Sequence, residues 1–141
     1  MGFRLLIVDD SSSMRSIVKR TVQMSGFDVD RFFEAEDGKA ALKLLDEEWV
    51  DVILSDLNMP VMDGEAFLAA LRANPVFSQI PVIVVTTEGR EEKLQQLRNL
   101  GARDFVKKPF KPEIIRDTLT RALGVESHES DTVVDDDGMD F

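Results

Sequence analysis

The sequence of 141 residues contains no cysteine and only one histidine. Without cysteine the chain cannot form disulfides, thiolate nucleophiles or cysteine-based zinc and iron–sulfur sites, and this composition fits a reducing cytoplasm. No uncharged apolar run approaches the roughly 20 residues that cross a bilayer. The first eight residues also lack the small-residue cleavage site of a secretory signal. We therefore expect a cytoplasmic protein that does not span a membrane.

Basic residues are scarce relative to acidic ones: 17 Lys and Arg against 27 Asp and Glu give a formal net charge of -10. Residues 125–141 contain no base and seven of the acids, namely Glu126, Glu129, Asp131, Asp135, Asp136, Asp137 and Asp140. Subtracting them leaves 20 acids against 17 bases, a net charge of -3, for residues 1–124. Neither part has the basic stripe that phosphate contacts require, so direct nucleic-acid binding is not expected. We expect residues 1–124 to form one domain and residues 125–141 a flexible acidic tail.

Short apolar runs alternate with segments of helical period along residues 1–124. The runs at 3–8, 50–55 and 81–86 are apolar at nearly every position, which predicts buried strands, and weaker strand signals lie at 29–34 and around Phe105. A helical period follows each strand, and its apolar positions include Ile17, Val18, Val22, Ala41, Leu45, Phe67, Leu71, Leu97, Ile114, Ile115 and Leu119. Five strands alternating with five helices predict an α/β fold, in which helices cover both faces of a doubly wound parallel sheet.

Polar side chains follow the predicted strands at their carboxyl ends, where ligands bind in such sheets. Asp9 and Asp10 follow the first strand, Asp56 the third and Lys108 the fifth, while Thr86 ends the fourth. Three converging carboxylates repel one another unless a cation or a shared proton relieves them. With oxygen ligands only, and the sole histidine out in the tail, Mg²⁺ is a better occupant than zinc.

Magnesium sites of this kind commonly add a phosphate oxygen to one or two carboxylates and waters, so the sequence points to a phosphoryl group. A lysine and a threonine hydroxyl can bind phosphate oxygens, and a carboxylate can itself accept the phosphoryl group as an acyl phosphate. Each signal is weak alone, because each residue has an ordinary structural explanation. Asp9 and Asp10 could cap the following helix, Asp56 could belong to a turn, and Lys108 could be an exposed surface lysine. Their coincidence at one sheet edge favours a functional site.

Four stretches carry a resemblance to a known family: LLIVDDSSSMR at 5–15, DVILSDLNMPVMDG at 51–64, PVIVVTTEG at 81–89 and GARDFVKKPF at 101–110. In this combination the chain resembles the receiver domain of two-component response regulators, the CheY-like fold, over residues 3–124. The resemblance implies five parallel strands in the order 2-1-3-4-5, as in flavodoxin-like proteins.

The resemblance also implies roles for individual residues. Asp56 matches the phosphoacceptor, and the Mg²⁺ ligands match Asp10, Asp56 and the backbone carbonyl of Asn58, with Asp9 acting through water. Thr86 matches the switch hydroxyl, Lys108 the phosphate contact, Phe105 the aromatic switch, and Lys108–Pro109 a cis peptide bond.

Three positions depart from the best-known chemotaxis receivers. Phe105 stands where they have tyrosine and so lacks the hydroxyl contact. Leu57 stands where they have tryptophan, directly after the phosphoacceptor. Thr87 replaces an alanine that is frequent after the switch threonine, and its larger side chain narrows access to the site. The sequences of the motifs still resemble those of chemotaxis receivers more than those of receivers fused to DNA-binding domains.

The function that the resemblance implies is a stand-alone phosphorylation switch rather than an enzyme acting on other substrates. A histidine kinase would phosphorylate Asp56, and a target protein would bind the face formed by the fourth helix, fifth strand and fifth helix. Two alternatives stay open. The receiver could serve as a phosphorelay shuttle or phosphate sink, or the chain could be an aspartate-nucleophile phosphatase. Such phosphatases have a second aspartate where this chain has Asn58.

Overall fold

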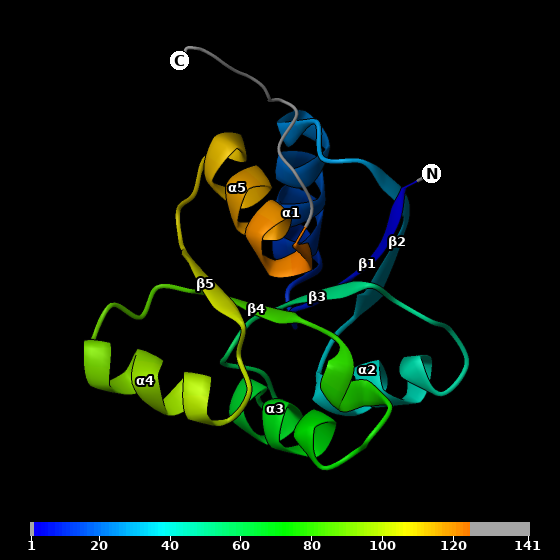
Figure 1. Cartoon of the computed structure of the whole chain (residues 1–141), viewed down its shortest axis with the longest axis vertical. Helices are drawn as coiled ribbons and strands as arrows, with labels where there is room; N and C mark the ends of the chain where they lie inside the picture. Colours follow the sequence, from blue (N-terminus) through cyan, green and yellow to red (C-terminus); the bar gives the residue numbers. More distant parts are fainter. Residues whose placement is uncertain (1, 125–141) are drawn as a thin grey trace.

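The computed structural model describes residues 2–124, so the predicted acidic tail at 125–141 lies outside the described residues. Strands and helices alternate throughout this range (Figure 1). In chain order they are β1 (Phe3–Val8), α1 (Ser12–Ser25), β2 (Val29–Ala35), α2 (Gly38–Leu45), β3 (Val52–Ser55), α3 (Gly64–Arg72), the 3-10 helix η1 (Phe77–Gln79), β4 (Val82–Thr86), α4 (Glu91–Asn99), β5 (Asp104–Lys107) and α5 (Pro112–Leu123).

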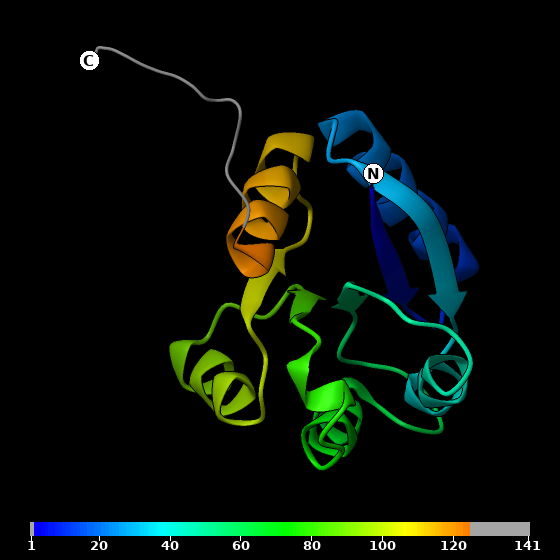
Figure 2. The ribbon, with the colours of Figure 1, turned by 45° about the vertical axis from the view of Figure 1, so that its right-hand side comes forward.

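The five strands are parallel and lie in the order β2-β1-β3-β4-β5, which confirms the predicted fold class and strand order. Helices α1 and α5 cover one face of the sheet, and α2, α3 and α4 cover the other (Figures 1 and 2). The central strands are therefore buried on both sides. Leu5 and Ile7 pack toward α1 and α5, whereas Leu6 and Val8 pack toward the other three helices.

Local signals set the ends of the helices. The side chains of Ser11, Asp37 and Asp63 each accept a hydrogen bond from the backbone N–H three residues later, which caps α1, α2 and α3. Helix α1 ends at Gly26, whose φ of 81° lies in the left-handed region that favours glycine. Pro112 opens α5, where its missing N–H costs no hydrogen bond.

Three details correct the expectations from the sequence. Ile17 and Ile114 are 54% and 50% exposed, because neighbouring Val18 and Ile115 occupy the centre of the buried stripe on α1 and α5. The short helix η1 was not expected. Strand β3 begins at Val52 rather than at residue 50.

Among the described residues, no helix combines the length and apolar character needed to cross a membrane.

Candidate phosphoryl-transfer site

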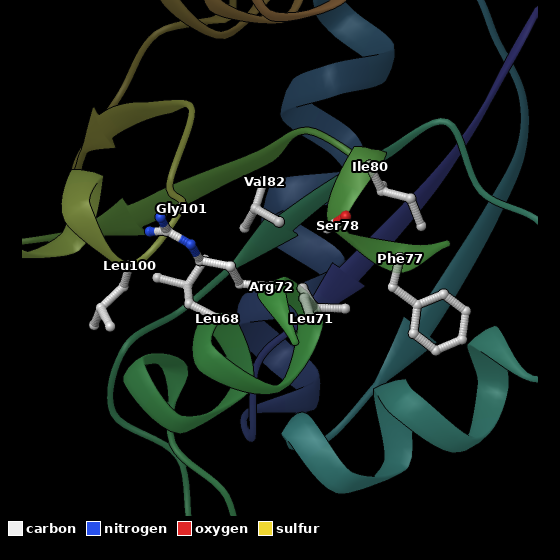
Figure 3. A pocket seen from close by; sticks show the side chains of 9 residues that line it. All are labelled: Leu68, Leu71, Arg72, Phe77, Ser78, Ile80, Val82, Leu100 and Gly101. Atoms are coloured by element: carbon white, nitrogen blue, oxygen red, sulfur yellow. The ribbon is translucent and has the colours of Figure 1, made fainter. Parts of the chain in front are cut away.

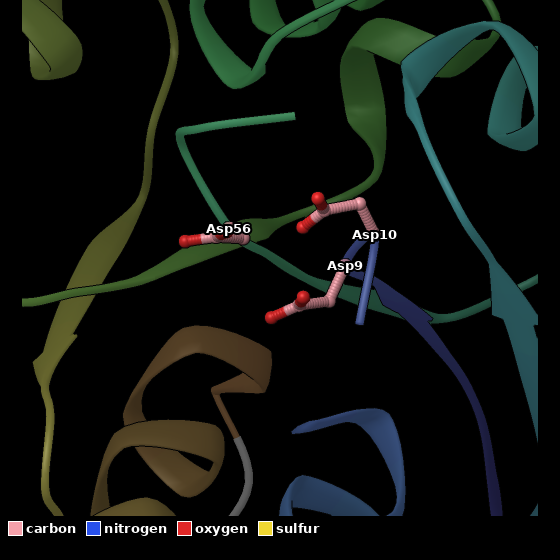
Figure 4. Close-up of side chains that lie close together, drawn as sticks. All are labelled: Asp9, Asp10 and Asp56. Carbon is pink, nitrogen blue, oxygen red and sulfur yellow. The ribbon is translucent and has the colours of Figure 1, made fainter. Parts of the chain in front are cut away.

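Three aspartates meet at the carboxyl end of the sheet (Figure 4). Asp9 and Asp10 follow β1 and Asp56 follows β3, and these strands are neighbours with Val8 opposite Ser55. The backbone N–H of Asp56 donates to the carbonyl of Val8 at 2.9 Å, which continues the strand pairing up to the acids. One carboxylate oxygen from each aspartate lies within 4.8 Å of the other two. The predicted convergence of the three acids is therefore confirmed.

Asp9 is the most deeply buried of the three, at 5% exposure. Burial raises the pKa of its carboxyl, and the negative charges of Asp56 and Asp10 raise it further, while a hydrogen bond from the Ser11 N–H and the charge of Lys108 oppose the rise. The site thus holds more negative charge than the surrounding residues compensate. A bound cation would relieve this repulsion.

Lys108 supplies the positive charge of the cluster. Its Nζ lies 3.4 Å from Oδ1 of Asp56 and 3.8 Å from Oδ2 of Asp9. The lysine follows β5 directly, its backbone N–H donates to the carbonyl of Thr86 at 2.8 Å, and its bond to Pro109 is cis as predicted. This backbone anchoring holds the ammonium group beside Asp56, where it can contact an anionic group attached to that carboxylate.

The Thr86 hydroxyl lies at the end of β4 and is buried at 4% exposure. Its Oγ1 accepts a hydrogen bond of 3.0 Å from the backbone N–H of Glu88. The hydroxyl is therefore engaged in a local turn, and a contact with a group on Asp56 would require it to leave this partner.

The loop after Asp56 folds back tightly onto this residue. The N–H of Gly64 donates to the carbonyl of Leu57 at 2.8 Å, and a Cβ added at Gly64 would lie only 2.5 Å from the carbonyl oxygen of Asp56. Only glycine permits this close approach. Asn58 belongs to this loop and, with Leu57 and Thr86, lines a cavity of about 310 Å³, but the ligand role of its carbonyl stays a prediction.

Ion pairs that the sequence did not reveal border this cavity. Lys93 of α4 pairs with Glu65 of α3, and Arg90 pairs with Glu88 at 2.9 Å, which lowers the pKa of Glu88 to about 2. Phe105 lies on β5 apart from the acid cluster, half-buried, with the guanidinium of Arg98 4.9 Å from its ring centre. Lys93 and Glu65 are 28 residues apart, so no local spacing could predict their pairing.

The donor set fits a hard divalent cation. The three acids offer oxygen atoms, and the chain has no cysteine that would favour a softer metal. Burial, and to a smaller extent the neighbouring acids, raise the pKa of Asp9, so a bound cation would favour its ionised form. Asp9, Asp10 and Asp56 are therefore the residues that could hold Mg²⁺.

Comparisons with known proteins agree with this geometry. A model of the response regulator receiver domain matches residues 5–120. A chemotaxis protein CheY homolog of Campylobacter jejuni is 39% identical over 127 residues, which cover 89% of this chain and 96% of the relative. The structure of the chemotaxis response regulator CheY4 of Vibrio cholerae is 39% identical with a TM-score of 0.78, covering 87% of this chain and all of that chain (100%).

A third similar structure is the receiver domain of a sensor histidine kinase from Pseudomonas aeruginosa, with a magnesium ion coordinated in its active-site cleft. It is 25% identical to this chain with a TM-score of 0.76, and the match covers 88% of this chain and 99% of that domain.

Proposed function

Since this chain belongs to the response regulator receiver family, we propose that it is a phosphorylation switch in which Asp56 accepts a phosphoryl group from a histidine kinase. The observation that carries the proposal is the joint placement of Asp56, two further acids and Lys108 at one edge of the sheet. The family match favours this function over the aspartate-nucleophile phosphatase. The similarity of this chain to chemotaxis proteins supports a role in chemotaxis or motility signalling.

The proposed reaction uses the carboxylate of Asp56 as the nucleophile. One of its oxygens attacks the phosphorus of a phosphohistidine, the new P–O bond forms as the P–N bond breaks, and the released imidazole nitrogen keeps the bonding electron pair. Lys108, already 3.4 Å from Asp56, is placed to neutralise a phosphoryl oxygen. Mg²⁺ held by Asp9, Asp10, Asp56 and the Asn58 carbonyl would supply further positive charge to these oxygens.

The response would begin at Thr86. A phosphoryl group on Asp56 offers charged acceptors to the Thr86 hydroxyl, which would then exchange the Glu88 N–H for this stronger partner. Movement of Thr86 would allow Phe105 to leave Arg98 and turn inward. The face formed by α4, β5 and α5 would thereby change shape and bind a target protein. We expect this to occur in the cytoplasm and to reverse by hydrolysis of the acyl phosphate.

A matched pair of variants tests the acceptor. Incubation with ³²P-labelled acetyl phosphate and Mg²⁺ should label the wild type and Asp63→Asn, because asparagine also caps α3 well. The same change at Asp56 should abolish labelling. Labelling of Asp56→Asn at the wild-type level would place the acceptor elsewhere and contradict the proposal.

A second experiment separates a switch from a phosphorelay shuttle or phosphate sink. Wild-type protein with and without beryllofluoride should be used to capture partners, with Asp56→Asn as the control. A target that binds only the beryllofluoride-treated wild type supports the switch. Rapid transfer of phosphate from Asp56 to a second histidine protein, without any such target, favours the shuttle.

A further inference from the structure

A second cavity, of about 370 Å³, lies at the end of the sheet opposite the acid cluster (Figure 3). It is bounded by α3, η1 and the loop after α4, and it includes Val82 at the first position of β4, whereas Thr86 at the other end of that strand borders the acids. Leu68, Leu71 and Val82 give it an apolar floor. The cavity can thus receive a large apolar side chain.

Two arginines at this end of the sheet carry charge that no nearby acid neutralises: Arg72 lines the cavity, and Arg103 lies between Val82 of the cavity and the last turn of α5. The guanidinium of Arg72 donates to the carbonyl of Asn99, and that of Arg103 donates to the carbonyl of Ala122 at 2.9 Å. Within residues 2–124, neither arginine forms an ion pair with a carboxylate. Both side chains are exposed. An acidic segment with an apolar side chain would therefore complement this surface in both charge and shape.

The chain itself brings such a segment to the cavity. Arg103 links the two places, because its N–H donates to the carbonyl of Val82 at 2.8 Å while its guanidinium reaches Ala122 in the last turn of α5. Gly124 follows two residues later, and residues 125–141 continue from there. Seventeen residues span at most roughly 56–61 Å when fully extended. Because a single arginine bridges Val82 and Ala122, the segment is long enough to reach the cavity.

We propose that residues 125–141 bind in this cavity of their own chain, with Phe141 on the apolar floor and the adjacent acids meeting Arg72 and Arg103. The segment has seven acids and no base, and Met139 and Phe141 place apolar side chains on either side of Asp140. The tether raises the effective concentration of the segment at the cavity to about the millimolar range, so weak contacts suffice. This inference does not depend on phosphorylation of Asp56.

The absence of cysteine allows a direct test in the full chain. A single cysteine introduced as Ser130→Cys carries a nitroxide label, and the loss of intensity of each ¹⁵N amide signal reports proximity to it. The amides of Leu71, Ser78 and Gly101 should lose the most intensity. The effect should weaken at least several-fold in 0.5 M NaCl, because salt at that level screens exposed charges.

Variants distinguish the proposed contacts from a general attraction. The double change Arg72→Gln and Arg103→Gln should restore the cavity signals, as should Phe141→Ala, which alters no residue of the described fold. Arg20→Gln, an exposed arginine on α1 and hence on the other face of the sheet, should leave the broadening unchanged.

Three outcomes would overturn the inference. They are broadening centred on α4, β5 and α5 near Lys107, broadening spread evenly over the surface, and broadening that survives both the arginine changes and Phe141→Ala. A mixture of spin-labelled ¹⁴N protein with unlabelled ¹⁵N protein gives the remaining control. Broadening of equal strength in this mixture would show binding between molecules rather than within one.

Discussion

The two ends of the sheet differ in how the charges of their acidic side chains are compensated. At the carboxyl end, Asp9, Asp10 and Asp56 crowd together with Lys108 as their nearby cation. At the amino end, Asp51 accepts hydrogen bonds from the Arg4 N–H at 2.8 Å and from the Trp49 indole at 3.2 Å.

At the amino end, the cations of β1 and β2 also have compensating partners. Arg4 pairs with Glu48 at 2.8 Å and donates to the carbonyl of Trp49. Arg4 and Arg31 both lie against the Phe33 ring, at 4.9 and 4.6 Å from its centre. We therefore expect a carboxylate to stabilise the fold at the amino end of the sheet and to destabilise it at the carboxyl end. The residues that compensate charge within the fold would then be separated along the strands from those proposed for phosphoryl transfer.

Among the changes that test this difference, Mg²⁺ should have the largest effect on stability, because a cation relieves repulsion between acids only at the carboxyl end of the sheet. At about 100 times the dissociation constant, a ligand specific for the folded state adds roughly 2.7 kcal/mol to its stability. We expect MgCl₂ to raise the melting temperature of the wild type, measured by calorimetry, and NaCl of equal ionic strength not to do so. A melting temperature indifferent to millimolar Mg²⁺ would disprove the metal site.

Asp51→Asn should destabilise the protein by about 1–2 kcal/mol, because an amide has one acceptor oxygen for two N–H donors and one donor loses its partner. Urea denaturation followed by circular dichroism measures the difference. An unchanged midpoint would mean that the charges at the amino end contribute nothing to stability.

Asp9→Asn is the same chemical change at the other end, and we expect the opposite sign. The pKa of Asp9 is raised, so its ionised form costs stability as pH rises above the ordinary value of 3.8. At pH 7 without metal, the variant should gain about 1 kcal/mol, or roughly 4 °C in melting temperature. It should also respond less to Mg²⁺. A loss of stability equal to that of Asp51→Asn would remove the contrast between the two ends.

Glu88 tests whether pairing with a cation lowers the pKa of an acid at the carboxyl end. Its side chain accepts hydrogen bonds from Arg90, and its pKa is lowered to about 2. The stabilising effect of its charge is thus present above pH 4.5 and lost as pH falls through about 2. NMR titration should give this midpoint, and Arg90→Gln should raise it. A midpoint above 4.5 would contradict the explanation by pairing.

Trp49 reports on the amino end and should change least. It precedes β3 while Asp56 follows it, so about 20 Å separates the two at roughly 3.3 Å per residue. We expect its fluorescence to stay nearly constant on addition of Mg²⁺ or acetyl phosphate. Strong saturable quenching would show that the two ends are coupled through a large rearrangement.

The sequence predicted the acid site better than its surroundings, for a physical reason. In a parallel sheet, the residues that follow the strands all lie along the same edge, so Asp10, Asp56 and Lys108 could be assigned to that edge without knowledge of any contact. Ion pairs such as Lys93 with Glu65 join two helices whose relative rotation depends on the packing of the whole layer. Periodicity likewise identified the buried side of α5 but misjudged Ile114, which lies at the border of the stripe.

The assembly of the acid cluster has a consequence for the order of folding. All three aspartates belong to the first 56 residues, whereas their lysine comes 52 positions after Asp56, beyond two further strands. Contacts of long sequence separation gain energy only after the intervening chain has closed. We therefore expect the amino-terminal half of the sheet to pair before Lys108 is in place, while its acids are still unneutralised. The hydrophobic pairing of β1 with β3 has to overcome this early repulsion unaided.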